Sequence, residues 1–243
     1  MADGLDLDAL SGYLAQFSNA PDGVEPGSPP RWQAELVEGG KSNLTYRITD
    51  GLHDWVLRRP PLGHVLATAH DMAREYRVMS ALARTPVPVP GMVTLCEDAS
   101  VIGAPFYVME FVEGAILRHA QDTADLDDGG RTALAEQLID TLADLHEVDP
   151  AQVGLDDFGH AEGFLPRQVR RWTQQLERSR TRDIPGSDEL ASGLAQRVPA
   201  SQRASVVHGD YRLDNVIVGP DQKIRAVLDW EMATLGDPLC DLA

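Results

Sequence analysis

The segment from Val206 to Val218, VVHGDYRLDNVIV, decides how the rest of the chain is interpreted. Two apolar, β-branched runs enclose a polar loop, a pattern that predicts a strand, a loop and a second strand. The loop carries His208, Asp210 and Asn215 in the spacing H-x-D-x-x-x-x-N. Fourteen residues after Asn215, Asp229 follows a further apolar run. This arrangement places polar side chains at the ends of neighbouring short strands.

The polar residues of this loop are suited to bringing an alcohol and a divalent cation together. A loop between two strands can direct the Asp210 carboxylate toward an incoming hydroxyl group, for which it can serve as a base. Asn215 and Asp229 can share a Mg²⁺ ion, which takes a few protein oxygens and completes its shell with water and phosphate. A turn in which Asp210 and Asn215 only bond to the backbone is the structural alternative.

Before this segment, the chain predicts an antiparallel sheet with helices. Strand-like runs bounded by turn signals are Trp32–Glu38, Leu44–Thr49, Asp54–Arg59, Met92–Cys96 and Pro105–Val112. Apolar spacing predicts a short helix through Leu10, Leu14 and Phe17 and a second helix over Asp71–Arg84. Glu75 falls on the apolar face of the second helix, where a carboxylate is costly unless a cation meets it. A solvent-exposed Glu75 is the alternative.

The second half of the chain predicts mainly helices, followed by a small β region. Helical patterns cover Arg131–Glu147, Leu165–Arg182 and Asp188–Val198. Strand-like runs then follow at Ser205–Val207, Val216–Val218 and Ile224–Leu228, of which the last two are joined by a hairpin loop. The outline is that of an α+β protein with a sheet-rich first part and a mainly helical second part.

Composition and charge exclude several classes of function. The chain has 243 residues and a formal net charge of −17, which disfavours binding to nucleic acids or to anionic membranes. No apolar run approaches the ~20 residues of a membrane span, and the N-terminus is acidic where a secretory signal is basic. Cys96 and Cys240 lack metal-site spacing and suit a reducing compartment. We therefore expect a cytoplasmic protein.

The ordered set of motifs resembles the aminoglycoside phosphotransferase and choline kinase branch of the protein-kinase-like fold. The H-x-D-x-x-x-x-N loop is similar to the kinase catalytic loop, and Asp229-Trp230 stands where kinases have Asp-Phe-Gly. Arg58-Arg59-Pro60-Pro61, Arg74-Glu75-Tyr76-Arg77 and Asp229-Trp230-Glu231 resemble more closely the phosphotransferases associated with acyl-CoA dehydrogenases. The resemblance covers nearly the whole chain.

The resemblance implies in-line phosphoryl transfer from ATP to an alcohol, with Mg²⁺ as the metal. It assigns Asp210 to the acceptor hydroxyl, Asn215 and Asp229 to the metal, and Arg212 to charge stabilisation near the transferred phosphate. Arg58, held by Glu75, would contact the α and β phosphates. The remaining nucleotide contacts come from the glycine-rich loop and the adenine hinge, namely Gly39, Gly40, Lys41, Ser42, Asn43, Glu110, Phe111 and Val112.

The chain departs from the family pattern in ways that leave other interpretations open. Arg58 replaces the usual lysine, and the glycine-rich loop has only Gly39 and Gly40, which also suit an ordinary hairpin turn. The family usually continues with helices beyond Ala243, so we expect the C-terminal lobe to be truncated. A catalytically inactive, nucleotide-binding pseudokinase or fragment is therefore the alternative to an active enzyme. A metallophosphatase is a weaker third interpretation, because the histidines show no ligand spacing.

We therefore expect a two-lobed small-molecule kinase. Residues 1–30 form an N-terminal helix and linker, residues 31–112 a nucleotide-binding lobe, and residues 113–243 a catalytic lobe. The acceptor is an alcohol, with hydroxyacyl-CoA and aminoglycoside-like compounds both open; the oligomeric state stays undefined. Arg167, Arg171 and Arg178 form a cationic stripe at helical spacing, which either pairs with neighbouring acids or binds an anionic acceptor.

Overall fold

The computed structural model describes residues 4–18, 31–37, 43–62 and 71–242 and separates into two compact units. The first unit contains the residues up to Leu138 together with Arg212–Glu231, and the second contains Ile139–Tyr211 with the residues from Met232 onward. The fold is α+β, and its antiparallel sheet and helices follow the order that the sequence predicts.

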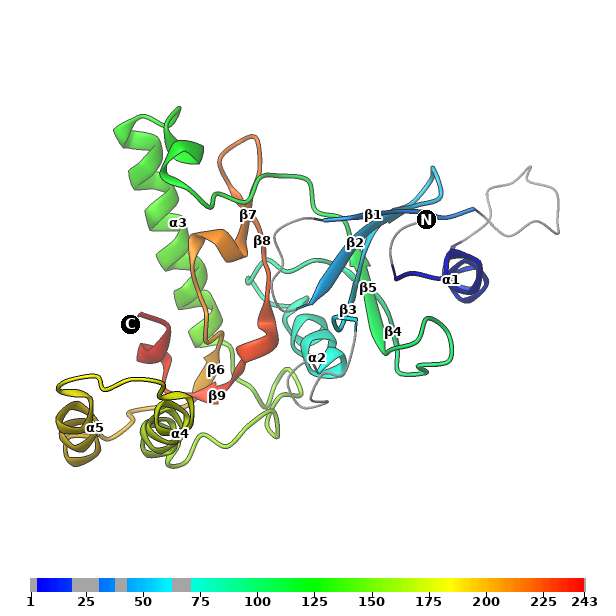
Figure 1. The fold of residues 1–243 in the computed structure, drawn as a ribbon. Coiled ribbons are helices and arrows are strands. Elements are labelled where there is room, and N and C mark those ends of the chain that lie inside the picture. Colours follow the sequence, from blue (N-terminus) through cyan, green and yellow to red (C-terminus); the bar gives the residue numbers. More distant parts are fainter. Residues whose placement is uncertain (1–3, 19–30, 38–42, 63–70, 243) are drawn as a thin grey trace. The chain divides into compact units, whose positions relative to one another are not determined.

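The five-stranded sheet of the first unit is antiparallel throughout, in the order β1-β2-β3-β5-β4 (Figure 1). Its strands are β1 (Gln33–Leu36), β2 (Leu44–Thr49), β3 (Asp54–Arg59), β4 (Met92–Cys96) and β5 (Phe106–Glu110). On the two central strands, Arg58 lies opposite Tyr107 and Leu57 lies opposite Val108. Because side chains alternate between the faces of a sheet, Arg58 and Tyr107 share one face and Leu57 and Val108 share the other.

Helices α1 (Leu7–Leu14) and α2 (Met72–Leu82) lie on opposite sides of this sheet (Figure 1). The Asp6 carboxylate caps the first helix, and Leu10 and Leu14 are fully buried in the apolar cluster that contains Leu57 and Val108. Helix α2 covers the face that carries Arg58. Its apolar residues Met72, Val78, Met79 and Leu82 are buried, and Glu75 is buried with them.

The returning segment of the first unit forms a hairpin from β7 (Val216–Val218) and β8 (Ile224–Val227). Short 3-10 turns, η2 (Leu213–Asn215) and η3 (Trp230–Met232), flank the hairpin. The amide of Leu228 donates to the Asn215 carbonyl oxygen at 2.8 Å, which ties the two ends of the hairpin together. The hairpin therefore places the backbone of Asn215 against that of Leu228, the residue before Asp229, so the two predicted metal ligands belong to adjoining backbone segments.

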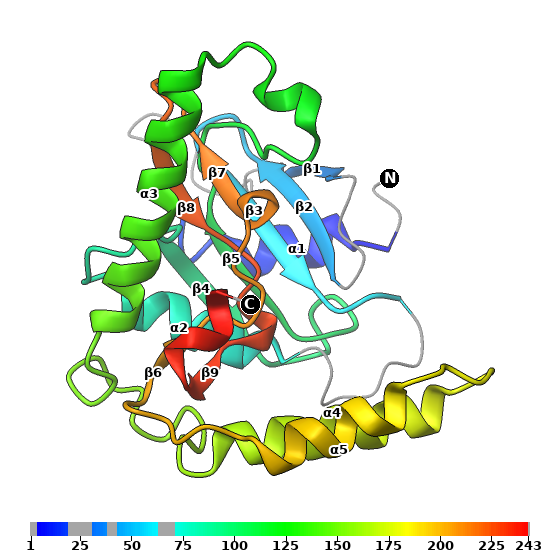
Figure 2. The same ribbon diagram turned by 90° about the vertical axis from the view of Figure 1, so that its left-hand side faces the viewer.

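Helix α3 (Asp128–Glu147) runs from the first unit into the second, which also contains α4 (Phe164–Ser179) and α5 (Ser187–Gln196). Helices α4 and α5 lie side by side (Figure 2). Strand β6 (Ser205–Val207) pairs with β9 (Thr234–Gly236), and the turns η1 (Ala120–Thr123) and η4 (Pro238–Leu242) complete the elements.

Several details differ from the expectations based on sequence pattern. Strand β9 was not expected; it forms by pairing antiparallel with β6, a partner about 30 residues earlier that a local pattern does not reveal. Helix α1 ends at Leu14, before Phe17, and helix α3 begins at Asp128 rather than Arg131. Helix α4 ends at Ser179 rather than Arg182, and helix α5 ends at Gln196 rather than Val198. Within the described residues, no helix combines the length and the apolar character that a bilayer crossing requires.

Candidate functional site

The centre of the candidate site is Arg58 of β3, whose guanidinium group pairs with two carboxylates. Its Nη1 atom lies 3.4 Å from Oε2 of Glu75 on α2, and its Nη2 atom lies 2.6 Å from Oδ1 of Asp229. The Arg58 side chain is only 11% exposed. The expected pairing of Arg58 with Glu75 is therefore present, and Asp229 joins it from a position 171 residues further along the chain.

Glu75 is held by three groups on the covered face of the sheet. Besides Arg58, the hydroxyl of Tyr107 donates to its Oε2 atom at 2.9 Å, and the amide of Asn43 donates to its Oε1 atom at 3.1 Å. Burial raises the pKa of Glu75 to about 7, although Arg58 and Tyr107 act to lower it. The surface alternative for Glu75 is excluded, because the residue is only 1% exposed.

Among the described residues, carboxylates outnumber cations around Arg58. Asp229 and Glu231 both act to raise the pKa of Glu75, whereas Arg58 acts to lower it. Burial acts to lower the pKa of Arg58, but the surrounding negative groups hold it above its ordinary value, so the side chain stays charged. Within the part of the chain that the structure describes, a buried oxygen of Glu231, Oε2, finds no hydrogen-bond partner. The described part of the cluster therefore carries more negative than positive charge.

Asp229 has a backbone conformation that an aspartate rarely adopts. Its φ is +66°, in the left-handed region, which costs about 1–2 kcal/mol for a residue with a Cβ atom. The strain persists because the neighbouring residues are fixed: Leu228 bonds to Asn215, and the indole of Trp230 donates to the Val227 carbonyl at 3.0 Å. The result is a carboxylate that turns out of the hairpin toward Arg58, with 31% of its side chain exposed.

The oxygen donors of this unit fit a divalent cation that also binds phosphate. Such a cation would take an amide oxygen from Asn215 and a carboxylate oxygen from Asp229, and Glu231 would offer an oxygen that has no hydrogen-bond partner among the described residues. Within the part of the chain that the structure describes, no three His, Cys, Asp or Glu side chains form a metal cage by themselves. This suits Mg²⁺, which takes one or two protein carboxylates and obtains its remaining oxygens from nucleotide and water.

In the second unit, Asp210 lies on a loop that a buried carboxylate anchors. The side chain of Asp241 in η4 is fully buried; its oxygens accept the amides of His208 at 2.9 Å and Gly209 at 2.7 Å, and one also lies 2.9 Å from Nε2 of His146. The Asp210 amide in turn donates to Nδ1 of His208 at 3.2 Å. His208 is completely buried and therefore braces the loop, whereas Asp210 is exposed.

Gly209 is required where it stands. Its φ is +85°, and a Cβ atom built on it would lie 2.9 Å from both Cβ and the carbonyl oxygen of Met232. A side chain here would therefore meet backbone as well as adopt an unfavourable conformation. The His-Gly-Asp sequence thus combines a buried brace, a tight turn and an exposed carboxylate.

The other predicted site residues fall into three groups. The guanidinium of the exposed Arg212 pairs with Asp214, with its Nη2 atom 2.6 Å from Oδ2. In the predicted hinge, the amides of Glu110 and Phe111 donate to the carbonyls of Gly91 and Asp54, and among the described residues Val112 makes no backbone bond through its amide. Gly39, Gly40, Lys41 and Ser42 lie outside the described residues.

Sequence reasoning missed three participants. Tyr107 begins the stretch that resembles the adenine hinge, and its hydroxyl contact with Glu75 was not predicted because it depends on the pairing of β3 with β5. Glu231 belongs to the Asp229-Trp230-Glu231 motif, but the motif assigned it no role. Asp241 follows the Gly-Asp-Pro sequence at 236–238, and nothing in its spacing indicated that it anchors a loop more than 30 residues earlier.

Comparison with known proteins identifies the family. Residues 33–243 match the model of the phosphotransferase enzyme family, and the chain belongs to this family. Acyl-CoA dehydrogenase family member 11 of Rattus norvegicus is 41% identical over 244 residues, which are 98% of this chain and 30% of that protein. Acyl-CoA dehydrogenase family member 10 of Mus musculus is 43% identical over 205 residues, which are 84% of this chain and 19% of that protein. The chain thus spans less than a third of either relative.

Solved structures agree on the fold. A protein of Ralstonia eutropha, provisionally described as an aminoglycoside phosphotransferase, is 39% identical to this chain and superposes on it with a TM-score of 0.82. The match covers 98% of this chain and 68% of that one. The ternary complex of APH(2″)-IIa with streptomycin and ATP has a TM-score of 0.66 at 18% identity, covering 99% of this chain and 75% of that one, and supports the fold alone. The predicted kinase-like fold is confirmed.

Proposed function

We propose that the chain is a Mg²⁺-dependent kinase that transfers the γ-phosphate of ATP to a hydroxyl group of a small molecule. The observation that carries the proposal is the cluster of Arg58, Glu75 and Asp229. Within it, one buried guanidinium is shared between two carboxylates, and Glu231 adds further negative charge. The carboxylates of the cluster would attract a divalent cation. Phosphate oxygens would then bind both to that cation and to the guanidinium group of Arg58.

The individual residues take the following roles. Asn215 and Asp229 would hold Mg²⁺, and the ion would supply charge neutralisation for the phosphates. Arg58, oriented by Glu75, binds phosphate oxygens through its planar, forked donors. The Asp210 carboxylate accepts the proton of the acceptor hydroxyl as that oxygen attacks the γ-phosphorus, and the bond to the ADP oxygen breaks in line.

Further nucleotide contacts come from the remaining predicted residues. The backbone of Val112 is available for the adenine edge, because the amides of Glu110 and Phe111 are already used within the sheet. The guanidinium of Arg47 covers the ring of Phe111 at 4.0 Å and fixes its orientation. Arg212 would reach the transferred phosphate only after leaving Asp214, as a phosphate could compete for it.

For the acceptor, we favour a hydroxyacyl-CoA over an aminoglycoside-like alcohol. Two relatives, 41% and 43% identical to this chain, are named as acyl-CoA dehydrogenase family members. The 39% identical protein provisionally described as an aminoglycoside phosphotransferase keeps the second class open. We further propose that the chain acts in the cytoplasm, where ATP is available and the free thiols of Cys96 and Cys240 stay reduced.

The proposal is tested with γ-labelled ATP and a panel of alcohols that includes hydroxyacyl-CoA thioesters and aminoglycosides. Wild-type protein should label at least one acceptor. Asp210→Asn should bind MgATP with a similar Kd but transfer phosphate at least ~100-fold more slowly. Equal transfer rates in the two proteins would contradict the role of Asp210. Thermal stabilisation by MgATP without labelling of any acceptor would instead favour an inactive nucleotide-binding module.

A further inference from the structure

Helix α4 has a charge opposite to that of the whole chain. Its sixteen residues include four arginines and a single acid, Glu177, whereas the chain as a whole carries 38 acids against 21 bases. One member of the predicted arginine stripe has a structural role. The guanidinium of Arg167 donates to the carbonyl oxygens of His160 and Glu162 and thereby holds the start of the helix. Arg171 and Arg178 are the remaining members that are candidates for binding an anion.

Arg171 and Arg178 are exposed, and neither pairs with an acid in the described part of the chain. Within the described ranges, no carboxylate oxygen lies within 4.0 Å of either guanidinium, although the neighbouring Arg180 pairs with both Asp183 and Asp188. The positions one turn away that normally carry a compensating acid are the glutamines Gln174 and Gln175. The interpretation of the stripe as a solvated face paired with acids therefore fails for these two residues.

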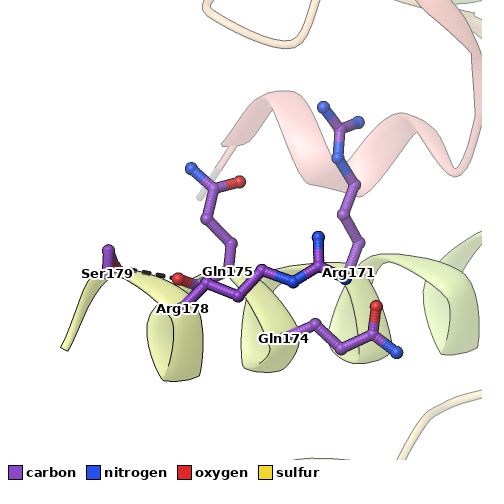
Figure 3. Close-up of a pocket in the computed structure, with 5 residues that line it drawn as sticks. All are labelled: Arg171, Gln174, Gln175, Arg178 and Ser179. Atoms are coloured by element: carbon purple, nitrogen blue, oxygen red, sulfur yellow. Dashed lines mark hydrogen bonds between the residues drawn. The ribbon is translucent and has the colours of Figure 1, made fainter.

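The two arginines line one shallow hollow of about 360 Å³ with Gln174, Gln175 and Ser179. Figure 3 shows the side chain of Arg178 running back along the helix toward Arg171, with Gln175 extending from the helix between them. The Ser179 hydroxyl is already used, because it donates to the Gln175 carbonyl at 2.8 Å. Among the described residues, the hollow thus presents guanidinium and amide donors and no carboxylate, which is the chemistry that recognises phosphate.

We propose that this hollow binds a phosphate group carried by the acceptor, with Arg171 and Arg178 as its ligands. The inference rests on the proposed kinase function and narrows its substrate class. Bringing two guanidinium groups together without an acid is unfavourable, and a bound phosphate dianion relieves the repulsion. An aminoglycoside is a polycation and would be repelled, whereas a coenzyme A thioester carries a diphosphate and a 3′-phosphate.

Trp172 provides a direct readout of binding. It is 48% exposed, whereas the other tryptophans, Trp32, Trp55 and Trp230, are at most 7% exposed. The Arg171 guanidinium lies 5.7 Å from the centre of the Trp172 ring, so a ligand that engages Arg171 changes the surroundings of this indole. Fluorescence can therefore be followed without ATP, and the result does not depend on phosphoryl transfer.

The experiment titrates the protein with coenzyme A, pantetheine and ATP while tryptophan fluorescence is recorded. We expect saturable quenching by coenzyme A, at least 10-fold weaker binding of pantetheine, which lacks the phosphates, and weaker binding of ATP by this signal. The double variant R171E/R178E should bind coenzyme A at least 10-fold more weakly. The charge-matched control R170E/R182E, on the same helix region but outside the hollow, should stay within about 3-fold of wild type.

The outcomes separate this proposal from the kinase proposal. Equal coenzyme A affinity in wild type and R171E/R178E, or equal loss in both double variants, overturns the phosphate site. So does a response to ATP as strong as that to coenzyme A, because the hollow would then be a general polyphosphate surface. Circular dichroism of both double variants checks the fold, and Trp172→Phe should abolish the signal while calorimetry still detects binding. If the phosphate site is overturned, the proposed kinase function still stands, because phosphoryl transfer to an acceptor that carries no phosphate does not require this hollow.

Discussion

At the scale of single residues, the identity of Arg58 sets the character of the site. A lysine offers one compact charge, whereas the forked guanidinium of Arg58 reaches Glu75 and Asp229 at once, at 3.4 and 2.6 Å. Because Arg58 contacts Asp229, the negative charge of this predicted metal ligand is already partly neutralised by a guanidinium group. Glu75, on the other side, is buried enough for its ionisation to oppose folding.

Glu75→Gln tests this burial. Because the pKa of Glu75 rises from 4.5 to about 7 on folding, the folded state binds more protons than the unfolded state between these values. The contribution of Glu75 to wild-type stability therefore falls as pH rises from about 4.5 through 7, by an amount of the order of 3 kcal/mol or less. The glutamine variant lacks this term, so its stability relative to wild type should improve over the same range.

Urea unfolding at several pH values between 4.5 and 8 measures the difference. The variant Glu177→Gln, which removes an exposed carboxylate outside this cluster, provides the control for the loss of one charge. A constant difference between wild type and Glu75→Gln would show that Glu75 ionises as it does in the unfolded chain.

Asp241→Asn tests the anchoring of the Asp210 loop. The carboxylate accepts the His208 and Gly209 amides and contacts His146, and an amide cannot accept at both of its ends. We expect a loss of about 2–4 kcal/mol in stability and a 10- to 100-fold lower kcat with little change in the KM for ATP. Hydrogen exchange of the His208 and Gly209 amides should accelerate. Asp128→Asn, a fully exposed aspartate, should alter none of these, and slow exchange retained in Asp241→Asn would refute the anchor.

At the scale of secondary-structure elements, short strands and tight turns position the functional groups. Strand β6 has only three residues, yet all are buried, and it delivers His208 into the interior of its unit. The hairpin of β7 and β8 positions Asn215 just before its first strand and Asp229 just after its second, and the Leu228 bond to Asn215 joins these two ends. In each case a turn next to a strand, rather than the strand itself, carries the polar side chain.

Two glycines with similar backbone conformations allow the contribution of a close contact to be separated. Gly51, in the turn between β2 and β3, has φ +89°, and no atom lies within 4 Å of the point that a Cβ atom would occupy, whereas Gly209 has φ +85° with Met232 at 2.9 Å. Gly51→Ala should cost about 1–2 kcal/mol from conformation alone. Gly209→Ala should cost more and should also lower kcat. Equal unfolding free energies for the two variants would exclude the contact.

At the scale of the whole molecule, the net charge of −17 dominates long-range electrostatics. Several ion pairs are exposed and contribute little, so the main effect of salt is to screen repulsion among acids. We expect Tm at pH 7 to rise between 20 and 300 mM NaCl, by the equivalent of about 1 kcal/mol or roughly 2–4 °C. KCl should act equally. A fall in Tm would mean that attractive pairs dominate instead.

Local patterns determined much of the architecture. Alternation and turn signals located the strands of the sheet, because a half-buried strand must alternate and a tight turn needs glycine or an Asx residue. Leu10 and Leu14 predicted the buried face of α1 for the same kind of reason, since helical periodicity is a property of the segment alone. The family motifs likewise depend on short spacings.

Tertiary structure alone decided which charges meet. The contact of Arg58 with Asp229 and that of Asp241 with the His208 amide join residues 171 and 33 positions apart. Such contacts depend on strand register, since a slip of one residue between β3 and β5 would turn Arg58 to the opposite face from Tyr107. The sequence alone determined which groups were available; only packing determined their partners, because burial energies depend on every neighbouring element at once.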